Sequence, residues 1–292
     1  MKEKLKILFI TGMVTSEHDP KMNAMLRFML ESTGRFEVKL TEEFTGATAE
    51  TLEKYDAVFI NYDGKDSVET PYVGWGERAE RALHEYVKSG GGAVIYHSSF
   101  IHGEPALSEE YDQLVGCCFD FRKGGRKSPK LEMIVDVDTE AHEITKGSAA
   151  FWMTSCEDFF CNMSWLEDVP VTVLATVRDD LKDYQDETKI QEHRKVDFVN
   201  ANLEELPGIN TDQPVAWVHN YGEGRVFTVS IGHGPDTLRR MSFVGMVCRA
   251  TEWVASGEIT IPYPDVQGDK RFRCWPYYMD MSIREFAALT SF

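Results

Sequence analysis

Three histidines lie where an α/β sheet presents functional groups. His97 ends a buried apolar run, residues 93–97, which follows three glycines. His233 lies between two glycines directly after the apolar run 225–231, and His18 lies in the loop after the first apolar run of the chain. In an open parallel sheet, ligands bind beyond the carboxyl ends of the strands. These three imidazoles are therefore expected to converge on one site.

Glu157 is the carboxylate that we predict as their partner, because it lies among aromatic residues in the segment TSCEDFF. Burial there would raise the pKa of its carboxyl toward that of a general base, or would let it bind a metal. An exposed acid at a strand edge is the alternative. Two imidazoles with one carboxylate suit a zinc-like site with an open position. His97, His233 and Glu157 are thus predicted both as catalytic groups and as ligands of a divalent metal such as zinc.

Substrate-binding residues are predicted around the same edge of the sheet. Asp63 follows another apolar run of strand length, and Ser98 and Ser99 follow His97 directly. Together with His18 they are expected to contact the substrate, although Asp63 also fits a simple turn. The sequence has no HExxH, no GxxxxGK[ST] and no GxGxxG after the first apolar run. It therefore gives no support for a metalloprotease or for a nucleotide cofactor.

Each histidine also has a structural interpretation. His97 and His233 fit buried or loop histidines without a function, and His18 fits a loop in which Ser16 or Asp19 caps the next helix. His219 precedes a predicted hairpin turn, so we expect it at the opposite edge of the sheet from His233. Three further predictions concern turn and surface positions: a turn formed by Asp138 with His142, and surface positions for His84 and His193.

The elements that must position these residues are predicted from hydrophobic periodicity. Apolar runs of strand length alternate with amphipathic stretches through the first hundred residues, which indicates strand-helix-strand units and an open, doubly wound, mostly parallel sheet with helices on both faces. Later segments predict two more strands, a β-hairpin and a final helix. The predicted strands are 6–11, 36–40, 57–61, 93–97, 131–135, 171–177, 214–219 and 225–231, and the predicted helices follow Pro20, span about 75–89 and span about 236–256.

One domain over residues 1–261 fits this pattern. Residues 178–212 are polar and irregular, and we interpret them as an insertion or lid. Because exposed aromatic side chains are unfavourable in water, we expect the aromatic-rich tail 262–292 to pack on the domain or on a neighbouring subunit of a homo-oligomer.

The charge of the chain excludes one class of partner. The chain has 292 residues, with 31 Lys+Arg against 48 Asp+Glu and a net charge of −17. Its densest basic run, residues 122–127, is short and is predicted as a solvated loop, so the sequence has no basic stripe that suits a nucleic acid.

The apolar runs and the cysteines indicate the compartment. No apolar run reaches the roughly 18 residues of a membrane helix, and the six cysteines lack a disulfide or metal spacing. A cytoplasmic protein without membrane or nucleic-acid partners is expected.

Several ordered motifs together resemble the ThuA-like (trehalose utilisation) family. They occupy residues 90–97, 141–147, 214–227 and 232–233, and the resemblance covers roughly residues 5–256. It implies a flavodoxin-like sheet related to the class I glutamine amidotransferases. By that similarity, His97 lies near the amidotransferase nucleophile elbow, and the segment that begins at His233 is similar to the His-Pro-Glu of those enzymes.

Two departures from the related patterns matter. The elbow reads His97-Ser98-Ser99 and holds no cysteine, so the chain is not predicted to be a glutamine amidotransferase. Glu143 stands where the family usually has a proline after the histidine, which weakens a functional role for the turn at His142.

The resemblance implies a substrate class. The family is associated with breakdown of disaccharides, especially trehalose and oxidised 3-keto-glycosides, and some members resemble metal-bound proteins. Our leading hypothesis is an enzyme acting on an unphosphorylated sugar by metal- or histidine-assisted acid/base chemistry, because acidic surroundings disfavour a phosphate. The alternative is a non-catalytic carbohydrate-binding or accessory subunit of a sugar oxidoreductase. A hydrolase using Ser98 or Ser99 with His233 is a third hypothesis.

Overall fold

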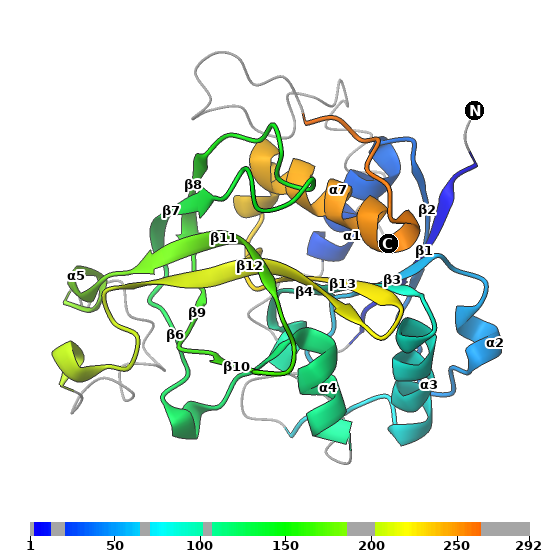
Figure 1. Cartoon of the computed structure of the whole chain (residues 1–292), viewed down its shortest axis with the longest axis horizontal. Coiled ribbons are helices and arrows are strands. Elements are labelled where there is room, and N and C mark those ends of the chain that lie inside the picture. Colours follow the sequence, from blue (N-terminus) through cyan, green and yellow to red (C-terminus); the bar gives the residue numbers. More distant parts are fainter. Residues whose placement is uncertain (1–2, 13–20, 65–70, 102–106, 186–201, 264–292) are drawn as a thin grey trace.

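A computed structural model describes residues 3–12, 21–64, 71–101, 107–185 and 202–263, and it is built around a mixed β-sheet (Figure 1). Within these residues the sheet has nine strands. In spatial order they are β2 (Phe36–Thr41), β1 (Leu5–Ile10), β3 (Ala57–Ile60), β4 (Gly92–Tyr96), β13 (Gly224–Val229), β12 (Thr211–Tyr221), β11 (Thr172–Asp179), β7 (Leu131–Val137) and β8 (Phe151–Glu157).

The sheet changes character at β13. The pairs from β2 to β13 are parallel, and the pairs from β13 to β8 are antiparallel. The α/β prediction is confirmed, but the sheet is mixed rather than mostly parallel. Strand β8 was not predicted, because its sequence lacks the alternation of a half-buried strand; it lies at the end of the strand order and its pairing with β7 includes a register shift.

Helices cover both faces of this sheet (Figure 1). On one face lie α1 (Lys21–Ser32) and α7 (Met241–Ser256), and on the other lie α2 (Ala49–Leu52), α3 (Glu77–Lys88) and α4 (Ser108–Val115). Helix α7 begins later than the sequence predicted, because a 3₁₀ turn over Thr237–Arg239 is followed by Arg240 in an extended conformation. Two-residue strands β5 (Cys117–Cys118), β6 (Arg126–Lys127), β9 (Phe160–Cys161) and β10 (Ser164–Trp165) form two small ladders outside the main sheet.

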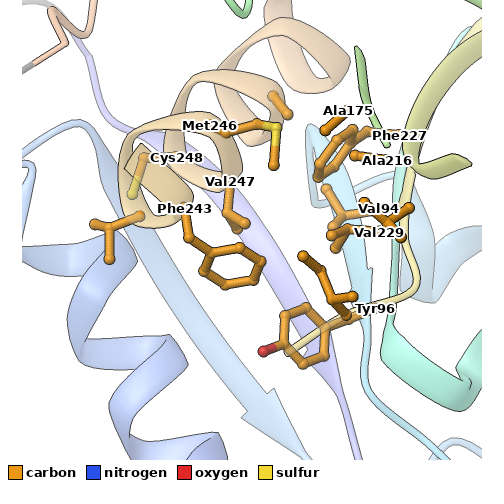
Figure 2. Packing of buried hydrophobic residues seen from close by; sticks show 14 of the residues in the cluster. Val94, Tyr96, Ala175, Ala216, Phe227, Val229, Phe243, Met246, Val247 and Cys248 are labelled. Carbon is orange, nitrogen blue, oxygen red and sulfur yellow. The ribbon is translucent and has the colours of Figure 1, made fainter. Parts of the chain in front are cut away.

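The core on the α7 face explains why α7 is apolar nearly all round. Figure 2 shows Phe243 and Val247 of this helix facing Val94 and Val229 of the central strands. The helix lies so close that a Cβ atom on Gly92 would come within 2.3 Å of the carbonyl oxygen of Val254. This contact holds the start of β4 against α7, and it leaves the carboxyl end of β4 for the residues that follow.

The predicted hairpin is confirmed as β12 and β13, joined by a tight turn. Gly222 has a φ of 62°, and a Cβ atom there would lie 2.6 Å from the carbonyl oxygen of Lys88. The strands are antiparallel, with His219 opposite Val226. His219 therefore lies at the end of the sheet away from His233, as the sequence predicted.

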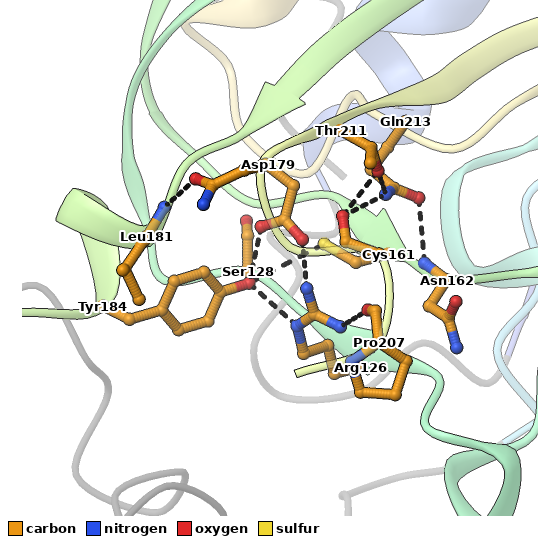
Figure 3. A network of polar contacts seen from close by, with 12 residues as sticks. Arg126, Ser128, Cys161, Asn162, Asp179, Leu181, Tyr184, Pro207, Thr211 and Gln213 are labelled. Carbon is orange, nitrogen blue, oxygen red and sulfur yellow. Dashed lines mark hydrogen bonds and ion pairs between the residues drawn. The ribbon is translucent and has the colours of Figure 1, made fainter. Parts of the chain in front are cut away.

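The basic run that was predicted as a solvated loop contains a buried arginine. Arg126 is ion-paired with Asp179, and its Nε donates to the Tyr184 hydroxyl at 3.1 Å (Figure 3). Its guanidinium also donates to the carbonyl of Pro207. The prediction was wrong for this residue because the acid that neutralises it is distant in the sequence. The network joins the two sides of the predicted insertion 178–212, which also holds α5 (Leu181–Tyr184) and a 3₁₀ turn over Leu203–Glu205.

Two sequence predictions lie mostly outside the described residues. These are the middle of the insertion, residues 186–201, and the tail from residue 264 onward. Just before that point, the guanidinium of Arg249 in α7 lies 4.7 Å from the ring centroid of Tyr263. Among the helices of the described ranges, none combines the length and the apolar character needed to cross a membrane.

Candidate functional site

His97 is placed by an unusual backbone turn. It is the first residue after β4 and begins a 3₁₀ helix over His97–Ile101, with a φ of 48°. A left-handed conformation is uncommon for a residue with a side chain, and such residues concentrate at functional sites. The Nδ1–H of the buried ring donates to the carbonyl of Ser230 at 2.8 Å. Because a carbonyl only accepts, Nε2 of the neutral ring carries the lone pair.

His233 reaches the same place from the neighbouring strand. Strands β4 and β13 are parallel and in register, with Tyr96 opposite Val229, so the residues after each strand are close in space. The ring centroids of His97 and His233 are 5.2 Å apart, and the rings are nearly perpendicular. Gly232 makes this approach possible: its φ is 115°, and a Cβ atom there would lie 2.1 Å from the Tyr96 hydroxyl oxygen.

Asp158 supplies the carboxylate of the cluster. It follows β8 directly and is fully buried, and its Oδ1 lies 3.8 Å from Nδ1 of His233. Candidate ligand atoms of His97, Asp158 and His233 all lie within 4.8 Å of one another. A zinc ion about 2.1 Å from each ligand needs ligand atoms no more than about 4.2 Å apart, so a small contraction would suffice. Two imidazoles and a carboxylate have the donor chemistry of a zinc site.

Glu157, the predicted partner, lies beside the cluster and contacts its backbone. Its carboxylate accepts from the amides of Gly232 and His233 at 3.2 and 3.0 Å and from the hydroxyl of Thr237. Burial and the charge of Asp158 raise the pKa of Glu157 to about 7, although these three hydrogen bonds lower it. The exposed-edge alternative is wrong, because the residue is fully buried. Glu157 therefore holds the loop that presents His233.

Two lysines complete the surroundings, and sequence reasoning missed both. Lys130 Nζ lies 2.9 Å from Nε2 of His233. Lys127 Nζ lies 3.7 Å from Oδ1 of Asp158 and 4.8 Å from the ring centroid of Phe160. Lys127 belongs to the run that was predicted as a solvated loop, yet its side chain is only 15% exposed. No local signal marks these lysines, because their partners are distant in the sequence.

The predicted substrate-binding residues are engaged with each other and with the backbone. The Ser98 hydroxyl donates to the Asp63 carboxylate, and the Ser99 hydroxyl accepts from the amide of Tyr62 at 2.8 Å. Within the described part of the chain, neither serine is hydrogen-bonded to an imidazole. The serine-hydrolase hypothesis therefore gains no support. His18 lies outside the described residues.

The remaining described histidines have structural surroundings. His84 is buried, with Nδ1 at 3.1 Å from the Tyr221 hydroxyl; the surface prediction was wrong because α4 covers that side of α3. Burial lowers the pKa of His219 to about 4. His142 accepts from the amide of Ile144 at 3.1 Å, which favours the turn interpretation. His193 lies outside the described residues.

The comparison with protein families decides the relationship. The family model ThuA, described as trehalose utilisation, matches residues 6–254. The chain belongs to the ThuA family. Membership in the ThuA family suggests a role in sugar metabolism. No functionally curated protein is significantly similar to the chain in sequence.

Solved structures share the ThuA fold at low sequence identity. A ThuA-like protein of Parabacteroides merdae is similar with a TM-score of 0.70 and 20% identity, over 93% of this chain and 97% of its own. A ThuA-like protein of Bacteroides uniformis has a TM-score of 0.62 and 18% identity, over 87% and 93%. A cytoplasmic protein of Salmonella typhimurium has a TM-score of 0.55 and 15% identity, over 86% and 99%. At these identities the likeness concerns the fold alone.

Proposed function

We propose that this ThuA-family protein is an enzyme that acts on an unphosphorylated disaccharide or 3-keto-glycoside by acid/base chemistry. The observation that carries the proposal is the convergence of His97, Asp158 and His233 at the carboxyl ends of β4 and β13. Such an edge is where open α/β sheets bind ligands. The order β2-β1-β3-β4-β13, with helices on both faces, supports the flavodoxin-like interpretation to which that rule applies.

The chemistry follows from the proton positions in the site. A 3-keto sugar has acidic protons on the carbons beside its carbonyl. His97 offers the lone pair of Nε2 for such a proton, since its Nδ1–H is held by the carbonyl of Ser230. The Ser230 carbonyl stabilises the resulting imidazolium. His233, beside the carboxylate of Asp158, is then the group that gives a proton to a leaving oxygen.

A divalent metal such as zinc is part of the proposal as an optional component. His97 through Nε2, Asp158 and His233 would hold it, in place of the set with Glu157 that the sequence predicted. When bound, such an ion would polarise a carbonyl oxygen of the substrate, and because it would occupy the lone pair of Nε2, His97 serves as the base only in the metal-free protein. Glu157 keeps a positioning role through its bonds to the amides of Gly232 and His233. No nucleotide cofactor is proposed.

Replacement of His97 tests the function. The variant His97→Asn removes the imidazole, and asparagine tolerates the left-handed backbone at this position. We expect kcat/KM on 3-keto-trehalose to fall at least about 100-fold, the usual contribution of a positioned acid or base. His142→Asn is the matched control and should keep parental turnover. Full turnover by His97→Asn would refute the assignment, and calorimetric sugar binding by a parent protein that turns nothing over would favour the accessory-subunit alternative.

The proposal extends to the location and the assembly of the protein. The Salmonella protein with the same fold is cytoplasmic, which supports a cytoplasmic location. The aromatic tail, residues 262–292, supports a homo-oligomer, and the net charge of −17 with the absence of a long apolar run in the sequence supports a protein without nucleic-acid or membrane partners. Light scattering of the full chain and of a chain ending at residue 263 would test the assembly, because only the full chain should form the oligomer.

A further inference from the structure

Lys130 determines where the proton of His233 lies. A lysine ammonium has three donors and no acceptor. At 2.9 Å from Lys130 Nζ, Nε2 of His233 must therefore accept. The proton of the neutral ring is then on Nδ1, the nitrogen 3.8 Å from the Asp158 carboxylate. Lys130, His233 and Asp158 form one chain of charge-complementary groups.

The same arrangement conflicts with a metal ion at His233. With Nε2 accepting from the ammonium and Nδ1 protonated, the ring has no lone pair left for a cation. Coordination through Nδ1 would place the ring proton on Nε2, where it would face the donors of Lys130. Lys127, at 3.7 Å from Asp158, adds a second positive charge beside the carboxylate ligand. A metal can bind only if the ammonium of Lys130 leaves His233.

We propose that Lys130 is the built-in cation of this site: it competes with a divalent metal for His233 and, in the metal-free protein, is the catalytic electrophile that binds the carbonyl oxygen of the substrate. The second part of this inference rests on the proposed function. Within the described residues, the Lys130 ammonium is hydrogen-bonded to His233 alone, and the side chain is partly exposed. Its two other donors are therefore available to a substrate oxygen.

The proton transfer balances without any further reactant. His97 takes the proton from the carbon beside the carbonyl, and the C–H electron pair becomes the second bond between that carbon and the carbonyl carbon. The π pair of the carbonyl moves onto its oxygen, and the ammonium of Lys130 stabilises the negative charge that develops there. Return of the proton from His97 to carbon restores both groups.

Zinc titration by calorimetry tests the competition without measuring activity. The metal-stripped parent is compared with Lys130→Met, which removes the ammonium, and with Lys130→Arg, which keeps a cation. Lys127→Met is the matched control, because Lys127 is near Asp158 and not on the imidazole. We expect Lys130→Met to bind zinc at least tenfold more tightly than the parent and more tightly than Lys127→Met. Lys130→Arg should bind zinc as weakly as the parent.

The outcomes separate this inference from the proposed function. An equal gain in zinc affinity in Lys130→Met and Lys127→Met would show a general effect of charge and would overturn the competition. The competition would also be overturned if Lys130→Met bound zinc no more tightly than the parent, or if none of these proteins bound zinc. Turnover of 3-keto-trehalose by the parent would still support the proposed function in those cases. For the electrophile, turnover in the presence of a chelator should fall at least tenfold in Lys130→Met and stay parental in Lys146→Met, which removes an exposed ammonium that is paired with Glu143. A parental rate for Lys130→Met would overturn that role.

Discussion

His219 should make the stability of the protein depend on pH. The ring is 5% exposed, its Nε2 lies 3.3 Å from the Gln113 carbonyl, and burial lowers its pKa to about 4. In the unfolded chain a histidine has a pKa of about 6.5. Between these values the unfolded chain binds a proton that the folded chain does not. The stability contributed by the neutral ring is therefore complete above about pH 6.5 and is lost as the pH falls toward about 4.

The size of the effect follows from these two values. Between pH 7 and pH 5, the difference in proton binding lowers the free energy of unfolding by about 2 kcal/mol. In His219→Gln this pH-dependent contribution to the free energy of unfolding disappears, because the glutamine amide does not titrate. The amide can still donate to the Gln113 carbonyl. Urea unfolding at the two pH values, with unchanged m, measures it: the loss between pH 7 and pH 5 should be smaller in the variant by about 2 kcal/mol.

A control separates this titration from other acid effects. Asn220→Gln changes the exposed neighbouring residue without adding or removing a titratable group, so it should keep the parental difference between the two pH values. The reasoning would be refuted if His219→Gln lost as much stability between pH 7 and pH 5 as the parent does.

Two further predictions concern close approaches that hold the site and its surroundings. Gly232→Ala would place a Cβ atom 2.1 Å from the Tyr96 hydroxyl oxygen at a φ of 115°, so we expect a loss of about 1–3 kcal/mol of unfolding free energy in urea. Tyr96→Phe in the same chain should recover part of the loss, and equal stability of Gly232→Ala and the parent would contradict the close approach. Arg126→Met would leave the buried Asp179 without its cation and should cost about 3–5 kcal/mol, measured in the same way. The double variant with Asp179→Asn should be more stable than Arg126→Met alone, and a lower stability would contradict the pairing.

The fold was largely predictable because apolar runs report burial directly. The central strands are mainly apolar and largely buried on both faces, and their predicted positions agree closely with β1, β3, β4 and β13. Strand β8 was not predictable from the sequence, because its hydrophobic pattern is irregular and its place in the sheet depends on pairing with β7. The pairing directions beyond β13 depend on contacts across the sheet, which no local pattern records.

The site was predictable only where a strand end marks it. His97 and His233 follow neighbouring parallel strands, so the rule for sheet edges brought them together. Glu157 and Asp158 are adjacent, and only the structure shows that the first binds the backbone amides of the His233 loop while the second faces its ring. Lys130 could not be predicted, because its contact with His233 spans 103 positions of the chain.

The division of the sheet at β13 has a consequence for folding. The parallel strands β4 and β13 carry His97 and His233, whereas Asp158 follows β8, which joins the sheet through the antiparallel series. A chain whose parallel strands had assembled before β7 and β8 docked would hold both imidazoles but neither Glu157 to fix the loop nor Asp158 to balance the charge. The β4–β13 pairing and the contact of Asp158 with His233 both join segments distant in sequence, and such contacts form slowly. Catalytic competence therefore reports the completion of folding, and an assay of the site would detect intermediates that the helix content alone would not reveal.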